Sequence, residues 1–446
     1  MVNIKAPWDS HNADGIHIEN SNNIRIFNSV IGHGISIGSL AIRPDEDDVF
    51  RIHVTNCNIT NAKNGVRIKS WAHPYRSRVS QISFEHINVN NAFYDTWYQA
   101  CQSMEPSTVI IPKGKFLVGP ILVLKGSCKC PIDFHLQGDL VAPTYSASLN
   151  TDHWISFKYV DRLTVHGGGS LDGQGPSAWR HKCNNPPTRK HLPTSLRYYY
   201  VSNSGINNIT SINSKRFHFT IFSSTNITIN RVNIKAPWDS HNTDGIHIEN
   251  SNNIRIFNSV IGTGDDCISM GPGSKNINIT NVQCGPGHGI SIGSLAIRPN
   301  EDDVYGIHVT NCNITNAKNG VRIKSWARPY KSRVSQISFE HINLNNVSNP
   351  IVIDQQYCPS KPCKWGNSGV KINDVWYNNI YGTTPTQIAE MLNCSASNQC
   401  WNVNMKDINI AYQGAGGPAK SYCNHAHGVS YGQQQPLSCL GVGTVH

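Results

Sequence analysis

The sequence predicts an all-β protein built as a parallel β-helix, a solenoid of short strands. Two observations support this fold class. Short strand-like runs recur at intervals of a couple of dozen residues, and polar turn residues separate them. Charged residues make up only 15% of the 446 residues, while Gly, Asn, Ser, Thr and Ile are abundant between the apolar runs. This composition is typical of turn-rich β proteins.

The strand-like runs alternate apolar with polar residues, as strands with one buried face do. They include residues 226–229, 253–256, 276–279, 306–309 and 336–339. Asn is frequent between them and tolerates the left-handed backbone that sharp turns need. One coil cannot bury its own apolar face, so coils must stack on one another. A parallel β-helix satisfies this requirement.

One stretch, residues 92–101, is helical in character. Phe93, Trp97 and Ala100 fall on the same face of a helix. Since an uncovered coil exposes strand edges and core, we expect this helix to cap one end of the solenoid.

The segment before the helix is a near-copy of a later one. Residues 2–31 repeat 232–261 with a single substitution, and residues 32–92 repeat 287–347 with a handful of substitutions. Residues 262–286, about one coil of the repeat, have no counterpart in the copy. A recent duplication or a gene-model error is favoured over an evolved second module.

The net charge of +10 suits a polyanionic partner. Lys and Arg are scattered, without the basic runs typical of nucleic-acid binding, so we expect no nucleic-acid partner. No window of eighteen uninterrupted apolar residues occurs, and we expect no membrane span. An acidic polysaccharide remains open as the partner.

The chain has 14 cysteines, several of them in close pairs. Such spacing suits disulfide loops in an oxidising compartment, and no second pair follows with zinc-finger spacing. Asn-x-Ser/Thr sequons also fit secretion, but the N-terminus has no apolar h-region, so we expect no signal peptide in this chain. The cysteine pairs are 267 with 284, 358 with 363, 394 with 400, and 423 with 439.

Coil periodicity converts sequence spacing into geometry. Residues at equivalent positions of adjacent coils lie about 4.8 Å apart along the solenoid axis. Asp244, Asp265 and His288 are separated by such intervals, and Arg322 and Lys324 follow after one longer coil. We therefore predict that these side chains converge on one stripe, as acid–base catalysis requires.

Each motif taken singly is more often structural. Residues 242–245 suit an Asx turn, 265–266 a solvated or calcium-binding pair, and 287–289 a tight bend. Two cationic residues two positions apart, as at 322 and 324, point to the same side of a strand and more often simply lie on its exposed face. The four motifs together, in order and at coil spacing, favour a catalytic site instead.

These motifs resemble the four signature motifs of the polygalacturonases, in their usual order. Tyr357 resembles the active-site tyrosine of that family. The sequences of residues 289–295 and 319–326 are similar to those of the plant polygalacturonases, nearest the pollen exopolygalacturonases. The resemblance runs from about Ala92 to the C-terminus. The motifs are Asn242-Thr243-Asp244-Gly245, Gly264-Asp265-Asp266-Cys267, Gly287-His288-Gly289 and Arg322-Ile323-Lys324.

The resemblance implies a right-handed parallel β-helix with an N-terminal capping helix. It also implies inverting hydrolysis of α-1,4-galacturonosyl linkages in pectic homogalacturonan, with exo action favoured. Asp265 is then the general acid, Asp244 and Asp266 hold and deprotonate the attacking water, and His288 tunes the protonation of Asp265. The expected substrate-binding residues are Asn242, Arg322, Lys324 and Tyr357.

The resemblance also implies secretion to the cell wall, and we expect a monomer that needs no cofactor and no metal. We expect two units. Residues 1–91 are a non-catalytic partial duplicate of coils 232–346, because the copy lacks any counterpart of Asp265 and Asp266. Residues 92–446 form the catalytic β-helix.

Three alternatives remain at this point. An endo-polygalacturonase differs only in the loops that close the ends of the cleft. A pectate lyase shares the β-helix but needs an acidic calcium site and a basic proton abstractor, whereas here the acids accompany a histidine and two separate cations. A catalytically defective, pectin-binding duplicate product is suggested by the rearranged N-terminus.

Overall fold

The structure is a computed structural model. It describes residues 90–443 apart from 120, 145–150, 180–191 and 360–365. Of the first 89 residues it describes 3–4, 15–18, 22–27, 29–32, 35–40, 48–55, 57–60, 66–70 and 79–85.

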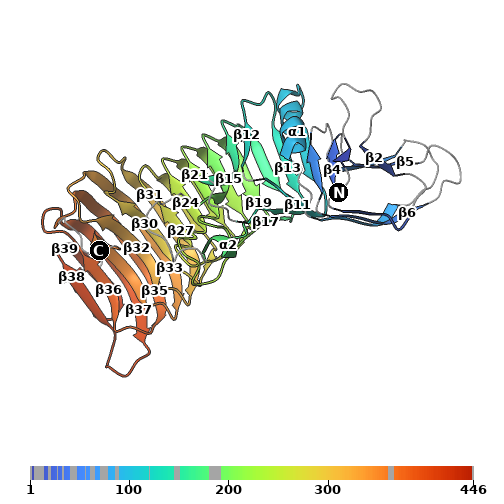
Figure 1. Cartoon of the computed structure of the whole chain (residues 1–446). Helices are drawn as coiled ribbons and strands as arrows, with labels where there is room; N and C mark the ends of the chain where they lie inside the picture. Colours follow the sequence, from blue (N-terminus) through green and yellow to red (C-terminus); the bar gives the residue numbers. More distant parts are fainter. Residues whose placement is uncertain are drawn as a thin grey trace.

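Two long parallel sheets wind along most of the chain (Figure 1). In the described residues the larger sheet has 20 strands and the other has 11. The larger sheet contains, in spatial order, β10 (Ser107–Ile111), β11 (Lys115–Leu117), β13 (Ile132–Leu136), β14 (Asp139–Val141), β16 (Leu163–His166), β17 (Ser170–Asp172), β19 (Ser202–Asn207), β20 (Thr210–Ile212), β22 (Thr225–Asn230), β23 (Asn233–Lys235), β25 (Asn252–Phe257), β26 (Val260–Gly262), β28 (Lys275–Thr280), β29 (Gln283–Cys284), β31 (Val304–Thr315), β33 (Ser332–Asn345), β35 (Val370–Thr384), β37 (Cys400–Tyr412), β39 (Ala426–Gln435) and β40 (Gly441–Val442).

The second sheet carries the candidate site described below. A short helix, α2 (Pro176–Trp179), lies in the connection between two of its strands. The strands are β12 (Leu122–Lys125), β15 (His153–Lys158), β18 (Thr194–Tyr199), β21 (Phe219–Phe222), β24 (Ile246–Glu249), β27 (Ile268–Met270), β30 (Ile290–Leu295), β32 (Asn319–Trp326), β34 (Asn349–Tyr357), β36 (Ile388–Asn393) and β38 (Lys420–Asn424).

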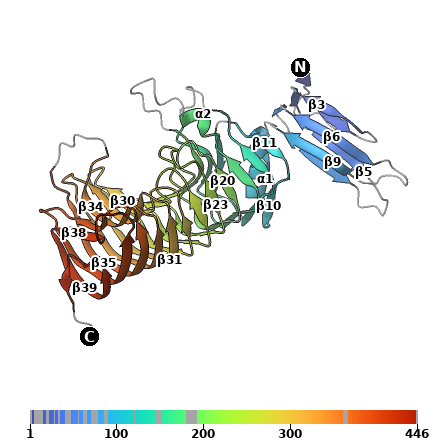
Figure 2. The same ribbon diagram turned by 90° about the horizontal axis from the view of Figure 1, so that it is seen from below.

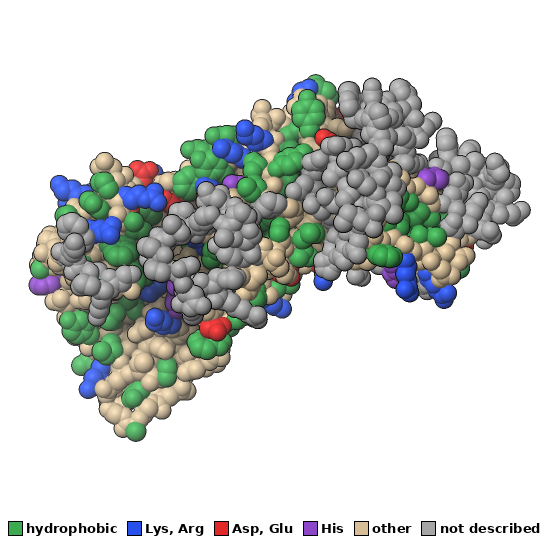
Figure 3. Space-filling model, viewed as in Figure 1, with side chains coloured by type: hydrophobic (Ala, Val, Ile, Leu, Met, Phe, Trp, Pro, Cys, Tyr) green, Lys and Arg blue, Asp and Glu red, His purple; other side chains and the backbone are tan. Residues whose placement is uncertain are grey.

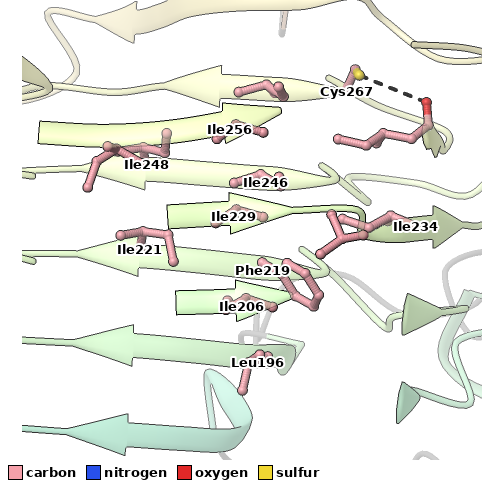
Figure 4. Close-up of a cluster of buried hydrophobic side chains, with 14 of the residues drawn as sticks. Leu196, Ile206, Phe219, Ile221, Ile229, Ile234, Ile246, Ile248, Ile256 and Cys267 are labelled. Carbon is pink, nitrogen blue, oxygen red and sulfur yellow. Dashed lines mark hydrogen bonds between the residues drawn. The ribbon is translucent and has the colours of Figure 1, made fainter. Parts of the chain in front are cut away.

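Stacked aliphatic side chains fill the interior of the solenoid. Ile206, Ile229 and Ile256 occupy the same register position on three successive coils, and all three are fully buried (Figure 4). The turns between strands use the left-handed backbone expected of Asn, as at Asn258 and Asn281, with φ of 52° and 54°. The Asn281 side-chain amide donates a hydrogen bond to that of Asn258, which links adjacent coils. The predicted alternation and Asn turns are confirmed.

The predicted capping helix is α1 (Asn90–Gln102), which contains the expected residues 92–101. It contacts β10 and β12, the first strands of the two sheets, and its buried face carries Phe93, Trp97 and Ala100. The Trp97 indole donates a hydrogen bond of 2.8 Å to a backbone carbonyl at the end of β12. This helix covers the end of the core that the first coil would otherwise expose.

The near-copy forms three small parallel sheets of its own. In the described residues its strands pair only with one another (Figures 1 and 2). The strand Asn58–Thr60 contacts α1, and the strand Val79–Glu85 contacts β11 of the larger sheet. The sheets are β1 (Asn3–Ile4), β4 (Val30–Gly32) and β7 (Asn58–Thr60); β2 (Ile16–Ile18), β5 (Ile35–Leu40) and β8 (Val66–Ser70); and β3 (Arg25–Phe27), β6 (Val49–Thr55) and β9 (Val79–Glu85).

The segment missing from the copy, residues 262–286, corresponds in the main solenoid to one coil that contains β27, β28 and β29. In the main solenoid, Ile268 of this coil pairs with Ile246 on one side and Ile290 on the other. In the copy, Ile16 and Ile35, the counterparts of Ile246 and Ile290, pair directly with each other. Loss of the coil therefore leaves the neighbouring coils in register. Asp14 and His33, the counterparts of Asp244 and His288, lie outside the described residues.

The cysteine prediction is partly confirmed. Cys394–Cys400, Cys423–Cys439 and also Cys101–Cys128 are disulfides, and Cys358 is disulfide-bonded. Cys363, its predicted partner, lies outside the described residues. The expectation for Cys267 and Cys284 is wrong in this structure, where both are buried free thiols. Both residues belong to the same coil, residues 262–286, and their side chains interact in the packed core as thiols.

The outer surface matches the composition analysis. On the face shown in Figure 3, Lys and Arg side chains are scattered and form no continuous basic patch. Within the described residues, no helix is long and apolar enough to cross a membrane.

Glu390 on β36 makes the stability of the solenoid depend on pH. Burial raises the pKa of this carboxyl from 4.5 to about 8, so the folded protein keeps a proton that the unfolded chain releases. The associated stability is fully present below the unfolded pKa and is lost as pH rises through the folded pKa. In chemical denaturation at about pH 5 and about pH 9, Glu390→Gln should lose less stability between the two values than wild type. The exposed Glu105→Gln is the control, and identical losses in all three proteins would contradict this prediction.

Candidate active site

An outward-facing column of polar side chains crosses four neighbouring strands of the 11-stranded sheet. His247 on β24, Ser269 on β27, Ser291 on β30 and Arg322 on β32 are paired in register (Figure 1). Parallel strands place equivalent residues about 4.8 Å apart, so the column gathers side chains from distant parts of the chain. The candidate carboxylates lie in the turns that precede β24 and β27.

Close packing of two turns sets the position of the carboxylates. Gly264 packs so tightly that a Cβ atom there would lie 1.9 Å from the Ser240 carbonyl oxygen. Its backbone N–H donates to the buried Thr243 hydroxyl at 3.1 Å, which ties the two turns together. Asp265 and Asp266 therefore lie in a bend before β27 rather than on opposite faces of a regular strand.

Asp266 is buried between two cations. Its Oδ1 accepts hydrogen bonds from Arg322 Nη2 at 2.8 Å and Ser291 Oγ at 2.9 Å, and its Oδ2 accepts one from Lys324 Nζ at 2.7 Å. Burial acts to raise the pKa of Asp266, but Lys324 and Arg322 outweigh it and hold the pKa at about 2. Asp266 is therefore ionised at neutral pH.

Asp265 is the most exposed of the three carboxylates, with a side chain 23% accessible. Its Oδ1 lies 2.8 Å from Nδ1 of His288 and accepts the backbone N–H of Asp266 at 2.9 Å. The His288 backbone N–H also donates to the Asp265 carbonyl. The predicted contact between Asp265 and His288 is present.

Asp244 is buried and has a different environment. Its Oδ2 accepts a hydrogen bond of 2.6 Å from Ser269 Oγ. Burial, followed by repulsion from Asp265 and Asp266, raises the pKa of Asp244 well above its usual range. Asp244 thus lies deeper than Asp265, the expected general acid.

The predicted cations and tyrosine are also brought together. Lys324 Nζ and Arg322 Cζ lie 5.3 Å and 5.9 Å from the centre of the Tyr357 ring, whose edge meets Trp326. Asn242 is half-buried in the turn before Asp244, with a φ of 55°. Arg322 and Lys324, expected to face substrate, are largely buried against Asp266 instead.

Sequence reasoning missed His247, Ser269 and Ser291. All three are outward residues of short alternating runs, and they recur at the same coil intervals as the aspartates. That spacing was the available signal.

One group of the site has the donors for a metal ion. Ligand atoms of Asp265, Asp266 and His288 all lie within 4.8 Å of one another. Both oxygens of Asp266 are already bonded to cationic side chains, so its charge is compensated without an ion. The donor set therefore fits a metal poorly.

Comparison with known proteins identifies the family. The model of the glycosyl hydrolases family 28 matches residues 27–97 and 101–439. The chain belongs to this family. An exopolygalacturonase of Oenothera organensis is 46% identical over 353 residues, 78% of this chain and 97% of the relative. A polygalacturonase of Gossypium barbadense is 45% identical over 356 residues, 79% of this chain and 87% of the relative.

The fold of this family 28 glycoside hydrolase has a counterpart among solved structures. The exopolygalacturonase from Thermotoga maritima is similar with a TM-score of 0.60 at 18% identity, covering 69% of this chain and 80% of that one. The likeness confirms the right-handed parallel β-helix. The family match to residues 27–97 falls on the near-copy and the first part of α1.

The buried ion pairs of Asp266 predict a stability cost. Lys324→Met should lower the free energy of unfolding by about 3 kcal/mol, because it leaves a buried carboxylate with less compensation. Combining it with Asp266→Asn should recover part of the loss, since the unpaired charge is removed. Chemical denaturation measures both effects, with the exposed Lys318→Met as control. A Lys324→Met variant as stable as the control would contradict the account.

Proposed function

We propose that this chain hydrolyses α-1,4-galacturonosyl linkages of pectic homogalacturonan by an inverting acid–base mechanism, with exo action favoured. One observation carries the proposal: Asp266 is ionised between two buried cations, and two further carboxyl groups lie beside it in the turns before β24 and β27. Family membership and the polygalacturonase and exopolygalacturonase names of the relatives support it.

Asp265 is assigned the role of general acid. It is the most exposed of the three carboxyl groups, so it is the one that reaches a bound glycosidic oxygen. His288 and a backbone N–H occupy Oδ1, which leaves Oδ2 as the oxygen that carries the transferred proton.

Asp244 and Asp266 are assigned to the attacking water. The low pKa of Asp266 makes it a weak base that binds water through a fixed negative charge. Asp244 is the better proton acceptor of the two, because its raised pKa makes its carboxylate the stronger base. An inverting reaction places such a water between acid and base, on the face of the sugar opposite the leaving group.

Substrate recognition is assigned to Arg322, Lys324, Tyr357 and Asn242. Arg322 uses Nε and Nη2 for Ser291 and Asp266, and Lys324 uses one of its three N–H groups for Asp266. The remaining donors can bind a galacturonate carboxylate by charge-assisted hydrogen bonds. Tyr357, next to both cations, is placed to pack against a sugar ring.

The proposed partner is the pectic polysaccharide, with no nucleic acid, membrane or cofactor involved. We propose that the protein acts as a monomer outside the cell, in the cell wall. The disulfides support an oxidising compartment.

The function is tested with Asp265→Asn, which preserves side-chain volume but removes the transferable proton. We expect release of reducing sugar from polygalacturonate to fall by at least about 100-fold with an unchanged circular dichroism spectrum. Chromatography of wild-type products should show galacturonate monomer from the outset. Mixed oligomers among the wild-type products would indicate endo action, and unsaturated products absorbing in the ultraviolet would indicate a lyase. Normal turnover by folded Asp265→Asn would refute the assignment of Asp265 as the general acid.

We further propose that residues 1–91 take no part in catalysis, while residues 92–446 form the catalytic unit. The missing coil removes the counterparts of Asp265 and Asp266. A chain that begins at Asn90, the start of α1, should keep the activity of the full chain, and the copy expressed alone should have none. A large loss of activity on deletion would show instead that the copy supports the capped end.

A further inference from the structure

A hydrogen-bonded chain runs along the polar column into Asp244. Ser269 Oγ donates to Asp244 Oδ2 at 2.6 Å, and the same oxygen lies 2.7 Å from Nδ1 of His247. His247 and Ser269 are paired in register on β24 and β27, so the contact follows from the stacking of the coils. Neither residue belongs to the four motifs by which the site was predicted.

The donor of each bond follows from the number of protons available. When Asp244 is ionised it can only accept hydrogen bonds, so the Ser269 hydroxyl donates to it and the Ser269 oxygen must accept the hydrogen bond from His247. In that state His247 carries a proton on Nδ1. The chain has one direction, from His247 through Ser269 to Asp244.

Neighbouring side chains hold the His247 ring in place. Nε2 of His247 lies 3.6 Å from Glu249 Oε2, two residues along the same strand. The ring also packs against Phe217 with the ring centres 4.8 Å apart. The imidazole is thus oriented before any substrate arrives.

We propose that His247 is a positioning residue for catalysis, which acts through Ser269 to orient the Asp244 carboxylate and to stabilise its ionised form. The proposal rests on the proposed function, in which Asp244 accepts a proton from water. With Oδ2 held by Ser269, Oδ1 is the oxygen presented to the water.

The charges around Asp244 explain why such help matters. Asp265 and Asp266 disfavour its ionised form, and burial acts in the same direction. Lys324 and Arg216 are the cations that interact with it. Lys324 is bonded to Asp266, so the hydrogen bond from Ser269 is the direct contact that favours the Asp244 carboxylate. Its loss raises the pKa of Asp244 further.

The test measures pH profiles of kcat and kcat/KM on oligogalacturonate. His247→Leu and Ser269→Ala should each lower kcat roughly tenfold with little change in KM, the effect of one lost hydrogen bond to a charged group. Both should move the acidic limb of kcat/KM up by roughly one pH unit, since Asp244 must be ionised. The double variant should be no worse than either single one, because the two bonds act in series.

Two further variants separate positioning from folding. His247→Asn keeps a donor near Nδ1 and should restore much of kcat and the position of the acidic limb. The matched control is His308→Leu, since His308 Nδ1 lies 2.9 Å from Ser338 Oγ in the same register arrangement on the 20-stranded sheet. This variant should leave both pH profiles unchanged.

Two results would overturn the proposal. One is an unshifted acidic limb in His247→Leu and Ser269→Ala, which indicates a structural role only. The other is wild-type kinetics in both variants. Asp244→Asn, measured in parallel, separates the positioning role of His247 from the role of Asp244 as base. If Asp244→Asn is inactive while His247→Leu has normal kinetics, only the positioning role is refuted. An active Asp244→Asn refutes the assignment of Asp244 as the base.

Discussion

The rest of the site depends on the compensation of one buried negative charge. Asp266 is removed from water, and an isolated carboxylate in that position is costly unless it is paired and hydrogen-bonded. Its partners, Arg322 and Lys324, come from β32, and Ser291 comes from the intervening β30. The buried charge of Asp266 is therefore compensated only when three coils are stacked in the correct register. Formation of the solenoid and formation of the ionised site are one event.

This pairing also makes three similar carboxyl groups chemically different. Asp266 takes both cations and keeps a low pKa, while Asp244, equally buried but without a bonded cation, has a raised pKa. Asp265 remains partly exposed beside His288. Groups whose environments separate their pKa values can divide acid and base roles between them. The near-copy at the N-terminus lacks the coil that supplies Asp265 and Asp266, so it lacks the basis for this division.

Much of the fold was predictable because its determinants are local and periodic. Alternating Ile residues, Asn at turns and the apolar face of residues 92–101 identified the strands, the turns and α1. Coil spacing likewise predicted that Asp244, Asp265 and His288 would converge. The sequence did not show which aspartate lies deepest or which anion the cations bind, because both depend on packing in three dimensions. Ser269 and His247 went unnoticed because such residues are common on solvent-facing strand positions. The spacing of Cys267 and Cys284 suggested a disulfide, but spacing does not determine whether two neighbouring thiols are oxidised.

The stereochemistry of the first product tests the central claim most directly. If Asp265 donates a proton while Asp244 and Asp266 direct a water to the opposite face, the α-linkage must yield a product that is initially the β-anomer. Proton NMR of oligogalacturonate hydrolysis, recorded before mutarotation equilibrates the anomers, distinguishes the outcomes. The account predicts that the β-anomer signal rises first and the α signal follows. Initial formation of the α-anomer would contradict it, because retention requires a carboxylate nucleophile and not an activated water.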